Sequence, residues 1–184
     1  MRYVALLLLV TFTPCFLGAQ APTDDSTTST ELSPEKEAQL ISDTRQITFE
    51  GRRAGEGYFS ADGSTLIFQS ERDPANPFFQ IFLMDLETGD TNRISPGHGK
   101  TTCAWIHPSG TKVMYASTQD DPEAKSKQAA EIKDREEGTT RKYSWDYDET
   151  YDIFESDLEG KNQKNLTKTR GYNAEGSYSA DGNW

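Results

Sequence analysis

The sequence predicts an all-β protein built from repeated units of four short antiparallel strands. One marker is a turn that ends in glycine and recurs at Gly63, Gly110 and Gly182. A second marker is an apolar residue followed by Ser or Thr, which recurs at Ile47, Ile94 and Leu166. Both markers are spaced by 47 and then by 72 residues. A unit that recurs at a period of roughly 40–50 residues is typical of a propeller or a similar array.

The longest repeated stretch surrounds the glycine turn. Residues 55–63 and 174–182 share Glu, Gly, Ser, Ala, Asp and Gly at matching offsets, and an aromatic residue precedes each shared Ser. Residues 103–110 form a looser copy. Because glycine adopts a positive φ without steric cost, each copy predicts a strand that ends in a tight hairpin.

Each complete unit divides into four runs of β-branched and aromatic residues separated by turn residues. In the first unit the predicted strands are 56–60, 66–70, 80–85 and 91–95. In the second unit they are 104–107, 113–117, 151–157 and 163–167. Four strands per unit predict one blade of a β-propeller. Blade one therefore covers about 55–95, blade two about 102–167, and a truncated blade three begins at 174. Residues 45–49 match the fourth strands and predict a further strand ahead of blade one.

The second unit is 25 residues longer than the first, and we assign the insertion to 120–148. Residues 122–137 are rich in Ala, Glu, Lys and Gln and precede Gly138, which predicts a helix with a glycine stop. Its apolar stripe is weak, so we expect a mostly solvated helix. Aromatic residues then alternate with charges, which makes Tyr143, Trp145 and Tyr147 candidate contacts for a partner. The alternative is that they hold the insertion against the blade.

The N-terminal residues predict export. A positively charged start, an apolar run and small residues at Ala19 and Ala21 indicate a signal peptide over 1–21, cut after either alanine. The chain is therefore expected to be periplasmic or secreted. Anchoring as a lipoprotein through Cys15 is the weaker alternative, because Pro14 precedes this cysteine. Residues 22–44 predict a linker in which a short helix runs from Pro34 to about Ile41.

Composition excludes two classes of partner. The 184 residues include 19 basic and 30 acidic side chains, for a net charge of −11. This charge argues against binding nucleic acid, whose phosphates need Lys and Arg, and against an anionic membrane surface. It permits a basic protein partner, and it also serves solubility.

The sequence carries no recognisable catalytic motif. It lacks a Gly-x-Ser-x-Gly elbow, a His-Glu-x-x-His pair and a phosphate-binding Gly-Lys-Thr loop. Its two histidines, His98 and His107, have no metal-ligand spacing with each other or with Cys103. We therefore predict no catalytic residues, no cofactor and no metal, and we expect Cys103 to be a small buried side chain.

Two acidic residues are the strongest candidate contacts. Glu56 and Glu175 begin the strand that would line the central channel of a propeller, and Cys103 holds the equivalent place in blade two. Repetition would set these residues around one mouth of the channel, where they could meet a basic partner. The alternative is local pairing with Arg52, Arg53 or Arg170, or capping of backbone N–H groups.

The units resemble the repeats of the TolB-like β-propellers of exported bacterial proteins. The family's blade reads aromatic-Ser-Pro-Asp-Gly, then Phe-x-Ser, then Ile-Tyr-x-x-Asp, then Leu-Thr. Here it corresponds to residues 59–63, 67–72, 81–85 and 94–95. Ala61 replaces the usual proline. The resemblance covers about 45–184, and because residue 184 falls inside an expected element, we expect a fragment of a longer propeller.

The resemblance implies a protein-interaction module, commonly of six blades, which in TolB itself works with the Tol and Pal proteins of the periplasm. We therefore expect an exported scaffold of the cell envelope without catalysis of its own. The alternative is the N-terminal propeller of an exported peptidase or other hydrolase, because relatives lie beside or ahead of hydrolase domains. A third hypothesis is carbohydrate binding by the aromatic residues of the insertion.

Overall fold

The computed structural model describes residues 33–139 and 147–184. The chain divides into two compact units, Met1–Arg45 and Gln46–Trp184. In the first unit, the described residues form one short helix, α1 (Pro34–Glu37). It ends earlier than predicted because the residues that follow have nothing to pack on: Leu40 is 78% exposed and Ile41 is 58% exposed. The expected signal peptide, with Cys15, lies outside the described residues.

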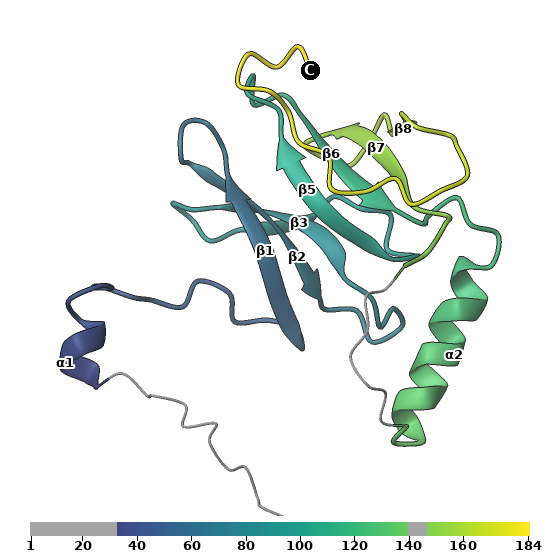
Figure 1. Ribbon diagram of the computed structural model, residues 1–184, viewed down its shortest axis with the longest axis horizontal. Helices are drawn as coiled ribbons and strands as arrows, with labels where there is room; N and C mark the ends of the chain where they lie inside the picture. Colours follow the sequence, from purple (N-terminus) through teal and green to yellow (C-terminus); the bar gives the residue numbers. More distant parts are fainter. Residues whose placement is uncertain (1–32, 140–146) are drawn as a thin grey trace, which may run out of the picture. The chain divides into compact units, whose positions relative to one another are not determined.

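The second unit contains two four-stranded antiparallel sheets, each with its strands in sequence order (Figure 1). The first sheet comprises β1 (Arg53–Phe59), β2 (Thr65–Glu71), β3 (Gln80–Asp85) and β4 (Thr91–Arg93). The second comprises β5 (Thr101–Ile106), β6 (Lys112–Ser117), β7 (Asp152–Asp157) and β8 (Lys164–Asn165). Every strand overlaps its predicted range, and the β3 range is the one predicted. The all-β, four-stranded organisation is confirmed; the residues described here form two complete sheets and no closed ring.

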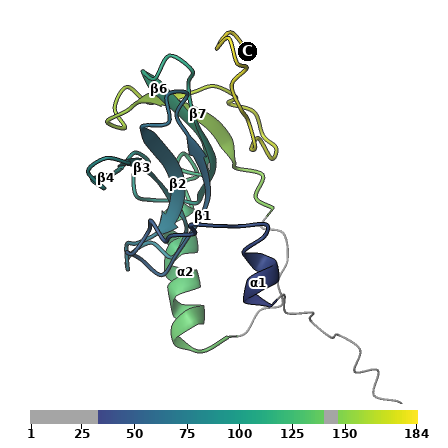
Figure 2. The same ribbon diagram turned by 90° about the vertical axis from the view of Figure 1, so that its left-hand side faces the viewer.

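The main core lies between the two sheets. β5 packs against β1, β2 and β3 of the first sheet, as the two views of the ribbon show (Figures 1 and 2). The Tyr58 ring stacks on Trp105 with their centroids 3.9 Å apart. The fully or nearly buried members of this core are Ile67, Ile81, Leu83, Ile94, Ala104, Val113, Tyr115 and Phe154. Burial of apolar surface between consecutive sheets is the arrangement of neighbouring propeller blades.

The repeated hairpin has the same hydrogen bonds in its first and last copies. The Ser60 N–H donates to the Thr65 carbonyl over 2.8 Å, and the Thr65 N–H donates to Ser60 Oγ over 3.0 Å. The Ser179 N–H donates to the Trp184 carbonyl over 2.7 Å, and the Trp184 N–H donates to Ser179 Oγ over 3.0 Å. In the middle copy His107 replaces the serine. The repeat seen in the sequence is therefore a repeat of backbone geometry.

The strand predicted at 45–49 is wrong, because these residues are not in a strand. In the complete sheets the matching residues extend the outermost strand: the N–H groups of Ile94 and Leu166 each donate over 2.8 Å, to the carbonyls of Ile81 and Ile153. Within the described part of the chain, no strand is paired with 45–49, so its backbone lacks that ladder and Phe49 is 78% exposed. A strand forms only where a neighbour accepts its hydrogen bonds.

The insertion forms helix α2 (Ala124–Glu136), close to the predicted 122–137. Its buried residues are Ala124 and Gln128, whereas Ala129 and Ala130 are exposed. Polar contacts hold the helix instead. The Gln128 amide accepts from the Gly99 N–H over 3.0 Å and donates to the Ala75 carbonyl over 3.2 Å. Neither α1 nor α2 has the length and apolar composition of a membrane span.

Candidate functional site

A repeated backbone irregularity places the candidate residues. Glu56, Cys103 and Glu175 all adopt a positive φ, of 40°, 51° and 62°. In β1 and β5 the register shifts at this position, so an extra residue bulges from the strand. A non-glycine residue pays a steric cost in this conformation. Three equivalent residues thus share a strained conformation at equivalent positions of successive repeats.

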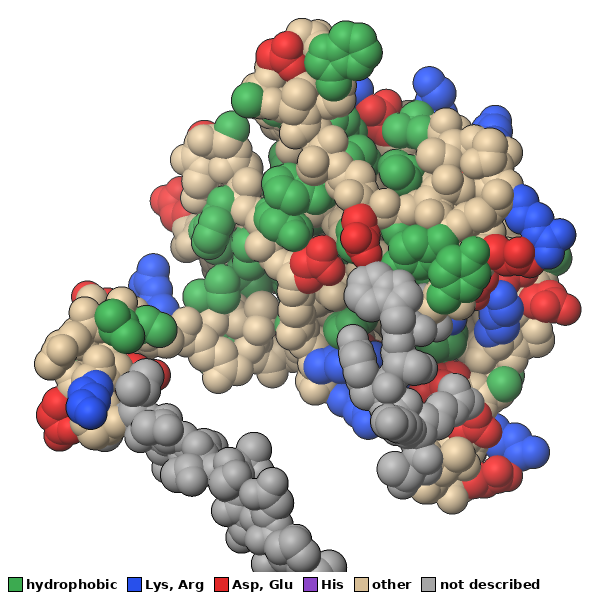
Figure 3. All heavy atoms as spheres, viewed as in Figure 1, with side chains coloured by type: hydrophobic (Ala, Val, Ile, Leu, Met, Phe, Trp, Pro, Cys, Tyr) green, Lys and Arg blue, Asp and Glu red, His purple; other side chains and the backbone are tan. Residues whose placement is uncertain are grey.

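The bulged residues line one large groove, with a volume of about 1330 Å³. Its walls come from β1, β5, α2 and residues 172–177. Acidic, basic and hydrophobic side chains lie side by side on the face shown in Figure 3. The groove is larger than the roughly 300–1,000 Å³ of ordinary small-molecule pockets.

The acidic end of the groove brings Glu56 and Glu175 around Cys103. Glu56 Oε2 lies 3.9 Å from Cys103 Sγ and 3.5 Å from Thr102 Oγ1. Burial, together with the charges of Glu56 and Glu175, raises the pKa of the Cys103 thiol to about 11, although a hydrogen bond with Thr102 acts in the opposite direction. Cys103 is 8% exposed, so the expected small buried side chain is confirmed.

The alternative of local ion pairs for these glutamates is not what the structure shows. Arg52 and Arg53 contact Glu71, and Arg170 contacts Glu149. In the part of the chain that is described, neither Glu56 nor Glu175 forms an ion pair. Both carboxylates are exposed to the groove.

Three arginines that meet at Glu71 also line the groove, and this cluster was not identified from the sequence. The buried Glu71 contacts three arginines: Arg53 Nε at 2.9 Å, Arg135 Nη1 at 2.5 Å and Arg52 Nη1 at 3.6 Å. Burial of Glu71 favours its neutral form, but hydrogen bonds from Arg135 and Arg53 hold its pKa below the usual range. Arg53 also lies over the Phe79 ring, 4.2 Å from the centroid. Arg135 also contacts Glu131, with Nε 2.8 Å from Oε1, and Asp134 lines the same groove, so charges of both signs meet at this place.

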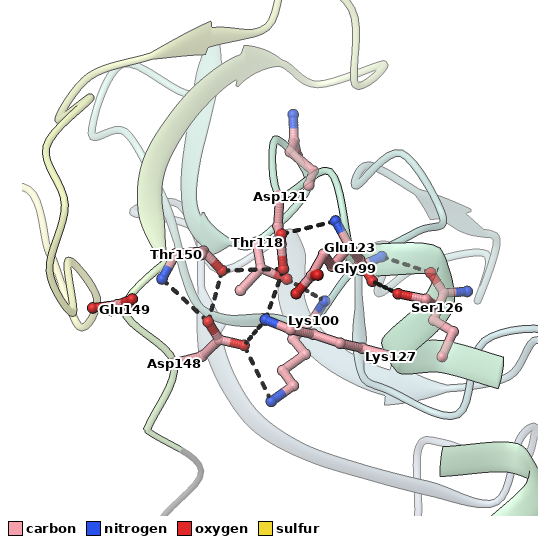
Figure 4. A network of polar contacts seen from close by, with 12 residues as sticks. Gly99, Lys100, Thr118, Asp121, Glu123, Ser126, Lys127, Asp148, Glu149 and Thr150 are labelled. Atoms are coloured by element: carbon pink, nitrogen blue, oxygen red, sulfur yellow. Dashed lines mark hydrogen bonds and ion pairs between the residues drawn. The ribbon is translucent and has the colours of Figure 1, made fainter. Parts of the chain in front are cut away.

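A second network fixes the base of the insertion (Figure 4). Lys127 Nζ of α2 lies 2.9 Å from Asp148 and 2.7 Å from Asp121, and Lys100 Nζ lies 3.5 Å from Asp148. Thr150 donates to Asp148 through its N–H and its hydroxyl. Burial penalises the charged form of Asp148, but the bonds from Thr150 and Lys127 outweigh it and lower its pKa to about 2. Asp148 is only 8% exposed.

Of the three aromatic candidates, only Tyr147 is described; Tyr143 and Trp145 lie outside the described residues. The Tyr147 ring is 66% exposed and stacks on Tyr172, with centroids 5.5 Å apart, at the edge of the groove. Tyr172 in turn meets the Tyr151 ring edge-on at 5.4 Å. These three tyrosines therefore add aromatic surface to the lining of the groove.

Nothing in the described part of the chain forms a recognisable catalytic or metal centre. No group of three His, Cys, Asp or Glu residues there is placed to hold a metal ion. His107 Nε2 lies 3.0 Å from the Gly182 carbonyl and Nδ1 lies 2.7 Å from Ser109 Oγ, so this ring joins two repeats. His98 Nε2 lies 3.1 Å from the Gln119 carbonyl, in a loop contact. The described residues of the groove therefore form a charged surface suited to binding.

Comparison with known proteins identifies likenesses in structure. No protein-family model matches the chain, and no curated protein matches it. It resembles TolB from Acinetobacter baumannii, with 25% identity and a TM-score of 0.48 over 74% of this chain and 26% of that chain. It resembles a putative TolB from Agrobacterium tumefaciens, with 23% identity and a TM-score of 0.51 over 74% of this chain and 42% of that chain.

A structure from a study of two prolyl endopeptidases is also similar, with 16% identity and a TM-score of 0.45 over 71% of this chain and 17% of that chain. The chain spans less than half the length of each of these proteins. The likeness to the Agrobacterium protein concerns the fold alone. The two sheets are therefore similar to consecutive blades of a TolB-like β-propeller fold.

Proposed function

We propose that this chain is part of an exported TolB-like propeller that binds a protein partner in the cell envelope and catalyses nothing itself. The observation that carries the proposal is the convergence of Glu56, Cys103 and Glu175 on one groove. Strained backbone at three equivalent positions is costly, and it aims exposed carboxylates into a shared space.

The size and lining of the groove favour a macromolecular partner. The groove is too large for an ordinary small ligand, and its lining includes both charged and aromatic side chains. Aromatic and Arg side chains are enriched where proteins contact one another. A groove lined in this way supports a scaffold role.

The proposal is tested by capture from envelope extracts with the purified chain as bait. The double variant Glu56→Gln, Glu175→Gln removes both groove carboxylates. The control Glu87→Gln, Glu159→Gln removes the same charge from exposed turns outside the groove. We expect a partner that the wild type and the control retain and the groove variant loses. Equal capture by all three baits would contradict the proposal.

The alternative, a propeller ahead of a hydrolase domain, predicts a different result. The sequence that follows residue 184 in the gene would then contain a Gly-x-Ser-x-Gly or a metal-ligand set. The carbohydrate hypothesis predicts glycan-array binding that is lost in Trp145→Ala. Either result would replace the envelope scaffold as the assignment.

A further inference from the structure

We infer that the last two turns of α2, residues 129–136, form a strap that Arg135 latches to the first sheet and that opens while both sheets remain folded. The inference goes beyond the proposed function, because it concerns how one wall of the groove is held and needs no partner. It depends on how little of this segment is buried and on the contacts of one guanidinium.

The first turn of α2 is firmly anchored. Ala124 is 3% exposed and Gln128 is 8% exposed. The Gln128 amide joins the helix to the Gly99 N–H and the Ala75 carbonyl. Lys127 Nζ lies 2.9 Å from the buried carboxylate of Asp148. These contacts hold the N-terminal end of the helix when its other end is released.

The remaining two turns bury very little. Among residues 129–136, all of which the structure describes, none is buried, and Ile132 is only partly so. Figures 1 and 2 both show the C-terminal end of α2 projecting beyond the sheets. A segment with few buried apolar contacts opens at a lower free energy than the core of a protein. Apolar packing therefore does not account for the position of these turns.

The Arg135 side chain supplies the latch. Its Nη1 donates to Glu71 Oε1 over 2.5 Å and its Nη2 to the Pro77 carbonyl over 2.7 Å, whereas its Nε donates to Glu131 one turn earlier in the helix. Hydrogen bonds between charged groups are the stronger ones. When the latch breaks, Glu71 keeps Arg53 at 2.9 Å, so its carboxylate remains paired and opening leaves no uncompensated charge there.

Release of the latch should also unwind the strap. Isolated helices shorter than about 12–15 residues are only marginally stable in water. α2 has 13 residues, and its N-cap residue, Glu123, makes no side-chain capping hydrogen bond. Ala130 and Glu131 line the groove, so opening removes part of one wall and uncovers Glu71. A ligand that binds only the open form would shift the population towards it.

The test is hydrogen exchange of the intact chain, read by mass spectrometry at several low urea concentrations. Fragments from 129–136 are compared with fragments from the central strand β6. After correction for intrinsic rates, we expect the strap amides to exchange at least about 100-fold faster than the β6 amides, yet slower than in the unfolded chain. Urea should accelerate β6 and leave the strap unchanged, because local opening exposes little surface. Equal rates with equal urea dependence, or a strap as fast as the unfolded chain, would overturn the inference.

The variants test the latch itself. Arg135→Met should accelerate exchange of the strap about tenfold, because it removes the bonds to Glu71 and Pro77. Lys133→Gln, which removes an exposed pair with Glu137, should stay within about twofold of the wild type. Arg135→Lys keeps the charge without the fork that reaches both partners, so it should give a smaller acceleration and serves if Arg135→Met does not fold. No acceleration in either Arg135 variant, or an equal one in Lys133→Gln, would refute the latch.

Discussion

Arg135 Nη1 of helix α2 donates to Glu71 Oε1 at the end of β2 across 2.5 Å, although 64 positions separate the two residues. The same guanidinium donates through Nη2 to the Pro77 carbonyl over 2.7 Å. The helix is inserted between β6 and β7 of the second sheet, whereas Glu71 and Pro77 belong to the first sheet and its loop. The insertion therefore fastens two blades together and builds one wall of the groove.

Loss of this contact should destabilise the fold. In Arg135→Met the buried Glu71 keeps Arg53 but loses its strongest partner, so we expect the free energy of unfolding to fall by about 1–3 kcal/mol. Lys133→Gln on the same helix removes only an exposed ion pair with Glu137. This control should change the free energy of unfolding by less than about 0.5 kcal/mol. Urea unfolding followed by circular dichroism measures both. Equal effects would mean that the contact contributes no more than a surface pair.

Stability should fall in acid because of Asp148. Its pKa is lowered from the ordinary value of 3.8 to about 2, so the ionised group stabilises the folded state. A lowered pKa contributes stability that is complete above the ordinary value and is lost as pH falls from about 4 towards 2. We expect a shallower decline over this range in Asp148→Asn, which cannot titrate. Melting temperatures of the wild type and of Asp148→Asn, measured at half-unit pH steps, test this expectation. Parallel declines of the two melting temperatures would contradict a role of Asp148.

Two equivalent hairpin glycines should respond differently to alanine. Gly89 and Gly160 both have a positive φ, of 81° and 71°, but a Cβ on Gly160 would lie 2.3 Å from the Ile94 carbonyl oxygen, whereas one on Gly89 meets nothing within 4 Å. Gly89→Ala should cost about 1–2 kcal/mol from backbone strain. Gly160→Ala should cost roughly 1–3 kcal/mol more, because the first blade must move away. Equal losses in chemical denaturation would show that the hairpin does not touch the first blade.

The reactivity of the Cys103 thiol should depend on the groove carboxylates Glu56 and Glu175. With a pKa of about 11 in place of 9.0, the thiol provides about 100-fold less thiolate at pH 8 than an ordinary cysteine. In a Cys15→Ser background, we expect iodoacetamide to alkylate the folded chain far more slowly than the unfolded chain. The double variant Glu56→Gln, Glu175→Gln should react faster, because two negative charges near the thiol are removed. An unchanged rate in that variant would place the carboxylates away from Cys103.

The repeat itself was predictable from the sequence, and so was much of what depends on it. Turn glycines and alternating apolar residues are local signals, so two markers with matching intervals were enough to predict four strands per unit and to align Glu56, Cys103 and Glu175. The helix of the insertion followed from its composition. The strand at 45–49 was predicted by the same markers and does not form, because pairing needs a neighbouring strand that a pattern in one segment cannot supply.

The amino-acid sequence by itself determined the blades, since hydrogen-bonded hairpins and buried strand faces are set by residues close together in the chain. Only the tertiary structure decided the groove. One contact joins Glu71 to Arg135 across 64 positions, and a second network buries Asp148 beneath Lys127 of the inserted helix. Charges so far apart in the chain meet only after the sheets have packed, because the Coulomb energy that pairs them depends on distance in space and on burial.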